Sequence, residues 1–211
     1  ILTDTTDALS LTLTSPISGP VGIKSYGGAN SVAYLLASNN TYQGDTTITG
    51  GRHMLFANYP SSLPGWDAGK LHVSGGGILG VAMGETATEG FTRAHFDTLV
   101  YGDLIPPDGG VVVDTTRLAD PDIVLPDPVT KGFGKTGPGD LTILAPVSAW
   151  FFTPEDGITD FRDSGPHTLG YISTTSGSLL ITNDADVTVG VVDDNAQSTF
   201  ASGIKTVHLG S

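Results

Sequence analysis

The 211-residue chain contains no cysteine and few charged side chains. Without cysteine, it can form neither a disulfide nor a thiolate metal site. Charged residues make up 15 % of the chain, and 22 acids against nine bases give a formal net charge of −13. Such an acidic chain argues against nucleic acid and anionic membranes as partners. No apolar run approaches the ~18 residues of a membrane-spanning helix, so no transmembrane segment is predicted.

Helix-forming residues are also scarce, whereas glycine is abundant. Glycine occupies 29 of the 211 positions, about twice its usual share of ~7 %. Hydrophobic residues make up 38 %, which is enough apolar surface to bury a core. They occur in short apolar or alternating runs bounded by Gly, Asn, Asp or Pro, a pattern typical of short strands joined by turns. Examples of these runs are Leu9–Leu13, Leu71–Val73, Ile78–Val81 and Leu141–Leu144.

One segment has the pattern of a short helix instead. Thr92 is suited to cap the first turn, and Gly102 is suited to end the last one. Between them, Phe96, Leu99 and Val100 recur at helical spacing. The sequence therefore predicts a single short helix inserted among the strands.

Internal repetition favours one all-β architecture over the others. Residues 23–36 and 133–143 both read as an apolar residue, a lysine, a glycine-rich turn and a strand, about 110 residues apart (133 − 23). A stacked coil requires such turns, and it buries its inward side chains only against neighbouring coils. The sequence therefore predicts an all-β chain wound as a β-solenoid. An antiparallel β-sandwich is the alternative.

Residues Asn40–Gly51 read Asn-Thr-Tyr-Gln-Gly-Asp-Thr-Thr-Ile-Thr-Gly-Gly. This segment closely resembles the autotransporter-associated β-strand repeat, whose core is Asn-Thr-Tyr-x-Gly-x-Thr. Lys24 and Lys135 stand where that repeat has Leu-x-Lys-x-Gly, so that the resemblance covers roughly residues 9–145. The chain departs from the repeat at Ser38, which replaces a glycine, and no second Asn-Thr-Tyr follows.

The resemblance implies a right-handed parallel β-helix exposed outside a bacterial cell. Residues 1–145 would form the repeat-bearing segment, and residues 146–211 would continue as divergent coils or a C-terminal cap. Since the first residue is Ile1, we expect a mature fragment or a piece of a longer chain. The implied role is a non-catalytic structural or adhesive stalk in a secreted, autotransporter-like passenger domain associated with the outer membrane. Its expected partners are the rest of that polypeptide and glycans or a host or matrix surface. A trimeric phage or virion fibre segment is a further hypothesis.

Six residues carry the structural part of this resemblance. Asn40 can bond along the coil direction as one rung of a ladder. Tyr42 suits an interior or corner position, and Gly44 permits a tight turn. The residues assigned to the repeat are Asn40, Tyr42, Gly44, Thr46, Lys135 and Gly137.

Oxygen-rich turns offer a candidate cation site near the C-terminus. Asp184, Asp186 and Asp193 come nearest to a calcium-binding loop. They lack the spaced ligands and distal glutamate of an EF-hand, so solvated turns are the favoured interpretation. No cofactor is expected, and structural Ca²⁺ is the alternative.

Aromatic residues provide the alternative function, a glycan-binding or polysaccharide-cleaving β-helix. Trp66, Trp150 and Phe152 are the candidate glycan contacts, provided that their rings are exposed. Residues 150–152 are three consecutive rings, which cannot all face inward on one strand. Packing at a coil end or side is the favoured role for these rings. We expect no enzymatic activity, because the glutamates are few and no nucleophile motif is present.

Overall fold

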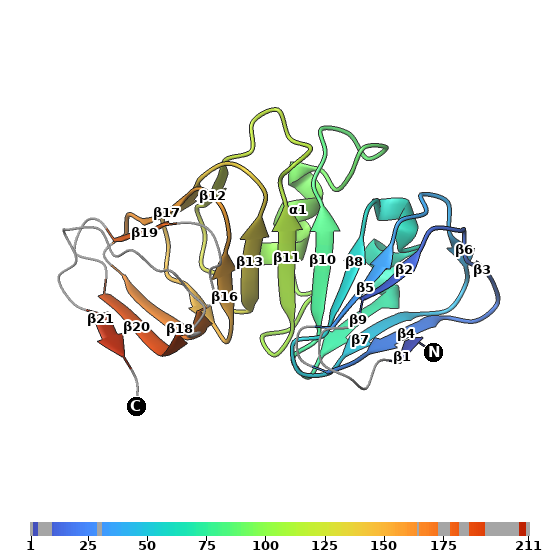
Figure 1. Cartoon of the computed structure of the whole chain (residues 1–211), viewed down its shortest axis with the longest axis horizontal. Helices are drawn as coiled ribbons and strands as arrows, with labels where there is room; N and C mark the ends of the chain where they lie inside the picture. Colours follow the sequence, from blue (N-terminus) through green and yellow to red (C-terminus); the bar gives the residue numbers. More distant parts are fainter. Residues whose placement is uncertain are drawn as a thin grey trace. The chain divides into compact units, whose positions relative to one another are not determined.

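The computed structural model describes residues 2–3, 10–28, 31–163, 165–172, 178–181, 186–192 and 207–209. Within them, every strand pair is parallel, and each strand pairs with strands of neighbouring coils (Figure 1). The predicted β-solenoid with one short α-helix is thereby confirmed, and the antiparallel sandwich is wrong. The chain divides into two compact units, Ile1–Arg117 (unit 1) and Leu118–Ser211 (unit 2).

Each coil of unit 1 passes through three sides. One side is a sheet of β1 (Leu2–Thr3), β4 (Ile23–Tyr26), β7 (Thr46–Thr49) and β9 (Leu71–Ser74). The second side consists of β2 (Ser10–Leu13), β5 (Val32–Leu35), β8 (Met54–Ala57), β10 (Ile78–Ala82) and β11 (Gly110–Asp114). The third side is β3 (Ser18–Gly19) and β6 (Thr41–Tyr42). After β8, a 3₁₀ turn at Pro60–Ser62 and a π-helical turn at Trp66–Lys70 precede β9.

The strand register gives the length of one coil in unit 1. Ser10 pairs with Val32, and Val32 pairs with Met54, so that the second side repeats after 22 residues (32 − 10 and 54 − 32). This period replaces the predicted recurrence of about 110 residues, which rested on the two lysines. The lysines are not equivalent, because Lys24 is exposed on β4 whereas Lys135 is fully buried.

Side chains of equal register form columns inside unit 1. Ala33, Leu55, Leu79 and Val111 stand above one another on β5, β8, β10 and β11, and each is at most 3 % exposed. A column of this kind buries apolar surface at every step, which contributes about 25 cal/mol for each Å² removed from water. The alternate residues of β5 and β8 face outward and are half-buried. This alternation explains why the runs around them read as mixed apolar and polar.

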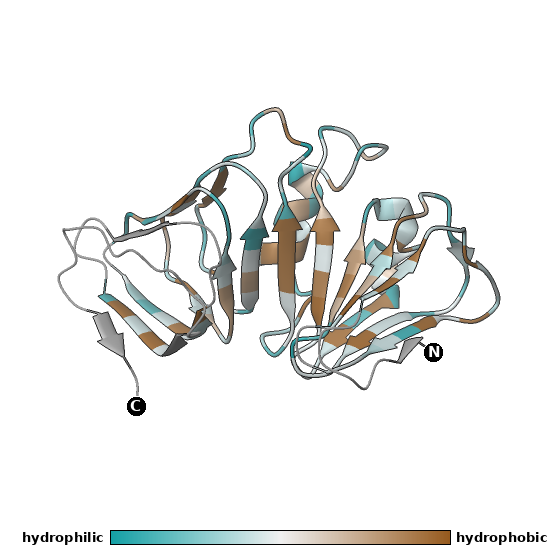
Figure 2. Ribbon diagram, viewed as in Figure 1, coloured by the Kyte–Doolittle hydropathy of each residue, from teal (hydrophilic) through white to brown (hydrophobic). Residues whose placement is uncertain are grey.

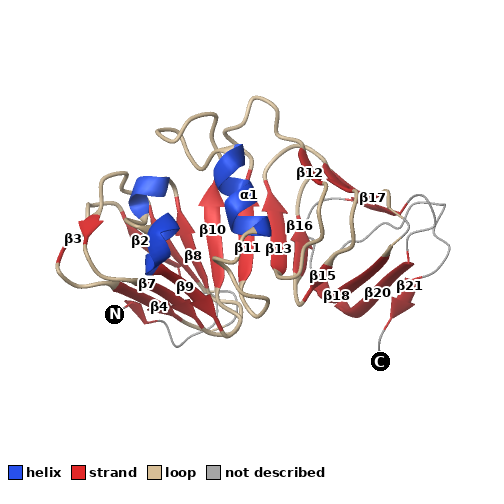
Figure 3. Cartoon of the chain, turned by 180° about the vertical axis from the view of Figure 1, so that it is seen from behind, coloured by secondary structure: helices blue, strands red, loops and turns tan. Residues whose placement is uncertain are grey.

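The last two strands of unit 1 are buried on both faces. β10 and β11 are brown along most of their length in Figure 2, and every residue of β10 is buried. The helix α1 (Arg93–Tyr101) lies between them in sequence and overlaps them in Figure 3. Thr92 caps it, Gly102 ends it, and Phe96, Leu99 and Val100 are its buried residues, as predicted.

The coils of unit 2 are shorter and have two main sides. One side contains β12 (Ile123–Leu125), β14 (Leu141–Ile143), β17 (Ile158–Phe161) and β19 (Ser178–Ile181). The other contains β13 (Gly132–Thr136), β16 (Phe152–Pro154), β18 (Pro166–Ile172), β20 (Asp186–Val192) and β21 (Val207–Leu209), with β15 (Ser148–Ala149) paired to β18.

The change in coil length marks the division of the chain. Ile123 pairs with Leu141, and Leu141 pairs with Thr159, an offset of 18 residues each time (141 − 123 and 159 − 141). The segment from Leu118 onward therefore belongs with the shorter coils, and the division falls there rather than between residues 145 and 146.

A close approach of two coils in unit 1 provides a test of the stacking. A methyl group at Gly22 would lie 2.7 Å from the backbone nitrogen of Asp45 on the next coil, whereas one at Gly51 would meet nothing within 4 Å. We expect Gly22→Ala to lower the free energy of unfolding by about 1–3 kcal/mol through overpacking. Gly51→Ala is the matched control and should change it by less than about 1 kcal/mol. Urea unfolding measures both, and equal effects would contradict the stacking.

Candidate functional site

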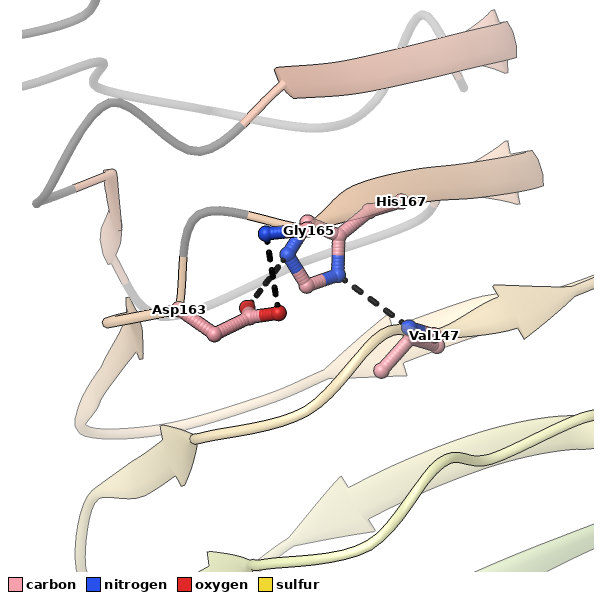
Figure 4. A network of polar contacts seen from close by, with 4 residues as sticks. All are labelled: Val147, Asp163, Gly165 and His167. Carbon is pink, nitrogen blue, oxygen red and sulfur yellow. Dashed lines mark hydrogen bonds and ion pairs between the residues drawn. The ribbon is translucent and has the colours of Figure 1, made fainter.

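A polar cluster lies inside unit 2 where the chain enters β18 (Figure 4). His167 is 1 % exposed. Its Nδ1 atom accepts a hydrogen bond from the backbone N–H of Val147 at 3.2 Å, and its Nε2 atom lies 2.7 Å from Asp163 Oδ1. The other carboxylate oxygen of Asp163 accepts the backbone N–H of Gly165 at 3.1 Å. The cluster therefore joins the coil of Val147 to the next coil.

These contacts define the tautomer and the charge of His167. Because Nδ1 accepts a backbone N–H, the ring proton is on Nε2, facing Asp163. Burial lowers the pKa of the imidazole, and the negative charges of Asp163 and Asp186 oppose this shift without cancelling it. The ring is therefore neutral at pH 7.

A second buried histidine occupies a corner of unit 1. Ser31 donates its hydroxyl hydrogen to the carbonyl of Gly28 at 2.8 Å, so its oxygen accepts from His53 Nδ1 at 2.7 Å. The Nε2 atom of His53 then accepts from the Ser25 hydroxyl at 2.6 Å. The residues come from three strand entries or strands of successive coils, and all three side chains belong to the buried core.

The contact between Ser25 and His53 has the length of a nucleophile–base pair. Catalysis also requires that a substrate reaches the serine oxygen. Ser25 is 0 % exposed, Ser31 is 1 % exposed and His53 is 3 % exposed. In the described structure, the pair is thus closed off from solvent, and its hydrogen bonds link coils.

The repeat-like segment supplies a further connection between coils. The side-chain oxygen of Asn40 accepts the backbone N–H of Ile17 at 2.8 Å, and its amide nitrogen donates to the carbonyl of Ser62 at 2.8 Å. Asn40 thus bonds to the coils on both sides of its own. Beside it, the buried hydroxyl of Tyr42 lies 2.6 Å from Thr46 Oγ1, and burial raises the pKa of Tyr42.

The other assigned repeat residues also lie at close coil contacts. A methyl group at Gly44 would lie 2.5 Å from the backbone nitrogen of Gly22. In unit 2, Lys135 is 0 % exposed, and its amine donates to the carbonyl of Gly137 at 2.6 Å. A second, longer contact joins the same amine to the carbonyl of Asp156 at 3.5 Å. A buried lysine needs such acceptors, since an uncompensated buried charge is costly.

The structure does not support the predicted glycan contacts. Trp66 is 6 % exposed and packs edge-on against Phe91 and His95 in unit 1, whereas Phe152 in unit 2 is fully buried. Trp150 is half-buried against Phe151. These three rings are core or packing residues, and a platform for a sugar requires an exposed ring face.

Other aromatic rings lie on the outward side of unit 1. Tyr34 on β5 and Phe56 on β8 are register partners, half-buried, with ring centroids 5.6 Å apart. On the next strand, Gly80 leaves room for them, because a methyl group there would lie 2.5 Å from the Phe56 ring and 2.7 Å from the sulfur of Met54. Val32, Tyr34, Met54 and Phe56 are called the outer strip below.

The predicted cation site falls largely outside the described structure. Asp184 and Asp193 lie outside the described residues, and Asp186 is exposed on β20. The described part of the chain contains no group of three or more His, Asp or Glu side chains arranged to hold a metal ion.

Two aspartates of unit 2 were not singled out by the sequence analysis. Asp122 Oδ1 accepts the backbone N–H of Asp140 at 2.7 Å, and Asp140 Oδ1 accepts that of Ile158 at 2.8 Å. Each carboxylate thereby binds the next coil. The signal was present, because residues 122–129 and 140–147 both read Asp, apolar, x, apolar, x, x, Pro, Val, 18 residues apart (140 − 122).

A comparison of the chain with protein-family models, with curated proteins and with solved structures returned no match. No helix of the described residues is long and apolar enough to cross a membrane.

The two bonds of Asn40 provide a test of the cluster in unit 1. Asn40→Ala leaves the N–H of Ile17 and the carbonyl of Ser62 without this partner, so we expect a loss of about 2–4 kcal/mol in the free energy of unfolding. The neighbouring Asn39 is exposed, and Asn39→Ala should change it by no more than about 0.5 kcal/mol. Urea titrations of both variants decide this, and a near-neutral Asn40→Ala would refute the bridging role.

Proposed function

We propose that the chain is a non-catalytic structural segment of a large extracellular bacterial surface protein, an autotransporter-like passenger stalk. The observation that supports this most directly is how the buried polar groups are used. The side chains of Asn40, His53 and His167 each contact a neighbouring coil. The polar interior thus serves the length and rigidity of the solenoid.

The surface of the chain supports the same role. The net charge of −13 keeps neighbouring acidic molecules apart and soluble. A solenoid gains stability from nearest-neighbour contacts, so coils can be added without a new core. These properties suit a spacer that holds other modules of the same polypeptide away from an envelope.

Exposure at the cell surface is the first test of this proposal. Antibodies raised against the folded chain should label intact cells of the source organism, because a passenger stalk lies outside the envelope. Brief protease treatment of intact cells should remove the labelling, and a cytoplasmic marker should stay intact as the control. Labelling that requires lysed cells would refute the extracellular role.

The outer strip favours glycan binding as a second function. Tyr34 and Phe56 present aromatic surface on adjacent coils, spaced by about one strand separation of ~4.8 Å. Aromatic faces stack on the C–H faces of sugar rings, and a strip of this kind follows an extended glycan. The acidic charge of the chain disfavours an anionic polysaccharide, so the ligand class is a neutral glycan.

A glycan array with matched variants tests this second function. Tyr34→Ala and Phe56→Ala should each lower affinity for a bound neutral glycan by about tenfold or more, since a stacked ring contributes on the order of 1–3 kcal/mol. Tyr26→Ala is the control, because Tyr26 is an exposed ring on the other sheet of the same unit. Equal binding by all three variants, or no binding by the unmodified chain, would exclude the outer strip as a glycan site.

A further inference from the structure

His167 occupies a position in unit 2 that valine occupies in the other coils. Val129 bridges to Val147, and Ser148 pairs with Thr168, which sets His167 beside Val147. On the far side, His167 pairs with Val187. The three valines are 0 % exposed. The column therefore packs with an apolar side chain, and the imidazole adds a polar contact that packing alone does not require.

That polar contact depends on the protonation state of the ring. Neutral His167 accepts the N–H of Val147, and a proton on Nδ1 would turn this acceptor into a donor facing another donor. The hydrogen bond would be lost, and a buried N–H left without its acceptor costs about 1–3 kcal/mol. The aromatic ring of Phe161, 4.7 Å from the imidazole, offers no acceptor lone pair.

The surrounding charges act in the opposite direction. Asp163 lies against Nε2, and Asp186 on the adjacent strand adds a weaker attraction for a positive ring. Asp160 on β17 is engaged by Arg162 at 2.6 Å. Burial outweighs the two attractive carboxylates, so the pKa of His167 lies below its usual 6.5.

We propose that His167 is an acid-sensitive lock of unit 2: the neutral ring holds the coil of Val147 to the following coil, and the protonated ring releases it. The folded state binds the proton less readily than the unfolded chain. The contribution to stability is therefore complete above about pH 6.5 and is lost as the pH falls below it. Each pH unit in that interval changes the unfolding equilibrium constant by at most about tenfold for one proton.

Urea unfolding of the full chain at pH 7.5, 6.5 and 5.5 tests the lock. The chain has two tryptophans, one in each unit. In a Trp66→Phe background, Trp150 fluorescence therefore reports on unit 2 alone. We expect the unfolding equilibrium constant of unit 2 to rise severalfold from pH 7.5 to 5.5. This range stays well above the usual aspartate pKa of ~3.9.

His167→Val places the residue of the neighbouring coils at this position and should abolish the pH dependence, whatever its effect at pH 7.5. His72→Gln, which removes an exposed histidine paired with Asp45, is the control and should leave the dependence intact. A flat profile for the unmodified chain would overturn the proposal. The same holds for an equal acid response in His167→Val.

Hydrogen exchange gives a second measurement, which does not depend on either variant folding. The protection factor of the Val147 amide in the unmodified chain should fall severalfold between pH 7.5 and 5.5. The Asn58 amide of unit 1, bonded to the Leu35 carbonyl at 3.1 Å, is the reference. Unchanged protection at Val147 would overturn the lock. The stalk proposal would survive that result, since surface labelling tests it separately.

Discussion

The stacking of equivalent positions on successive coils is the constraint from which the rest of this structure follows. Parallel strands in register place each side chain directly above its counterpart one coil away, as Ala33, Leu55 and Leu79 show. Whatever occupies an inward position must therefore suit both neighbours as well as its own coil. Apolar side chains meet this condition most simply. Glycine meets it where backbones approach, as Gly22 and Gly44 do.

Polar side chains inside the coils satisfy the same constraint by bonding across it. A buried polar group without a partner costs about 1–3 kcal/mol, so each must find donors or acceptors on adjacent coils. Asn40 does so with two backbone groups, which have no titratable proton. His167 uses one backbone donor and one carboxylate, so its bonding depends on a proton. The difference separates a permanent rung from a conditional one.

The sequence predicted those parts of the fold whose signals are local. The helix was recognisable because Thr92 and Gly102 mark its ends, and short strands followed from the apolar runs between glycines. The coil period was missed because the lysines at 24 and 135 suggested a repeat that their burial contradicts. The 18-residue recurrence of Asp122 and Asp140 was readable, since each aspartate precedes a strand and binds the next coil.

Side-chain direction limited prediction of the site, because a shift of one residue in a strand exchanges its two faces. Phe152 points inward and Phe56 partly outward for this reason, and composition does not distinguish them. The His167 column shows what comparison between coils adds. Valine fills this position at 129, 147 and 187, so packing does not explain a histidine there. An imidazole that replaces a valine brings a hydrogen bond whose strength varies with pH, and that dependence is the property a structural role alone would not require.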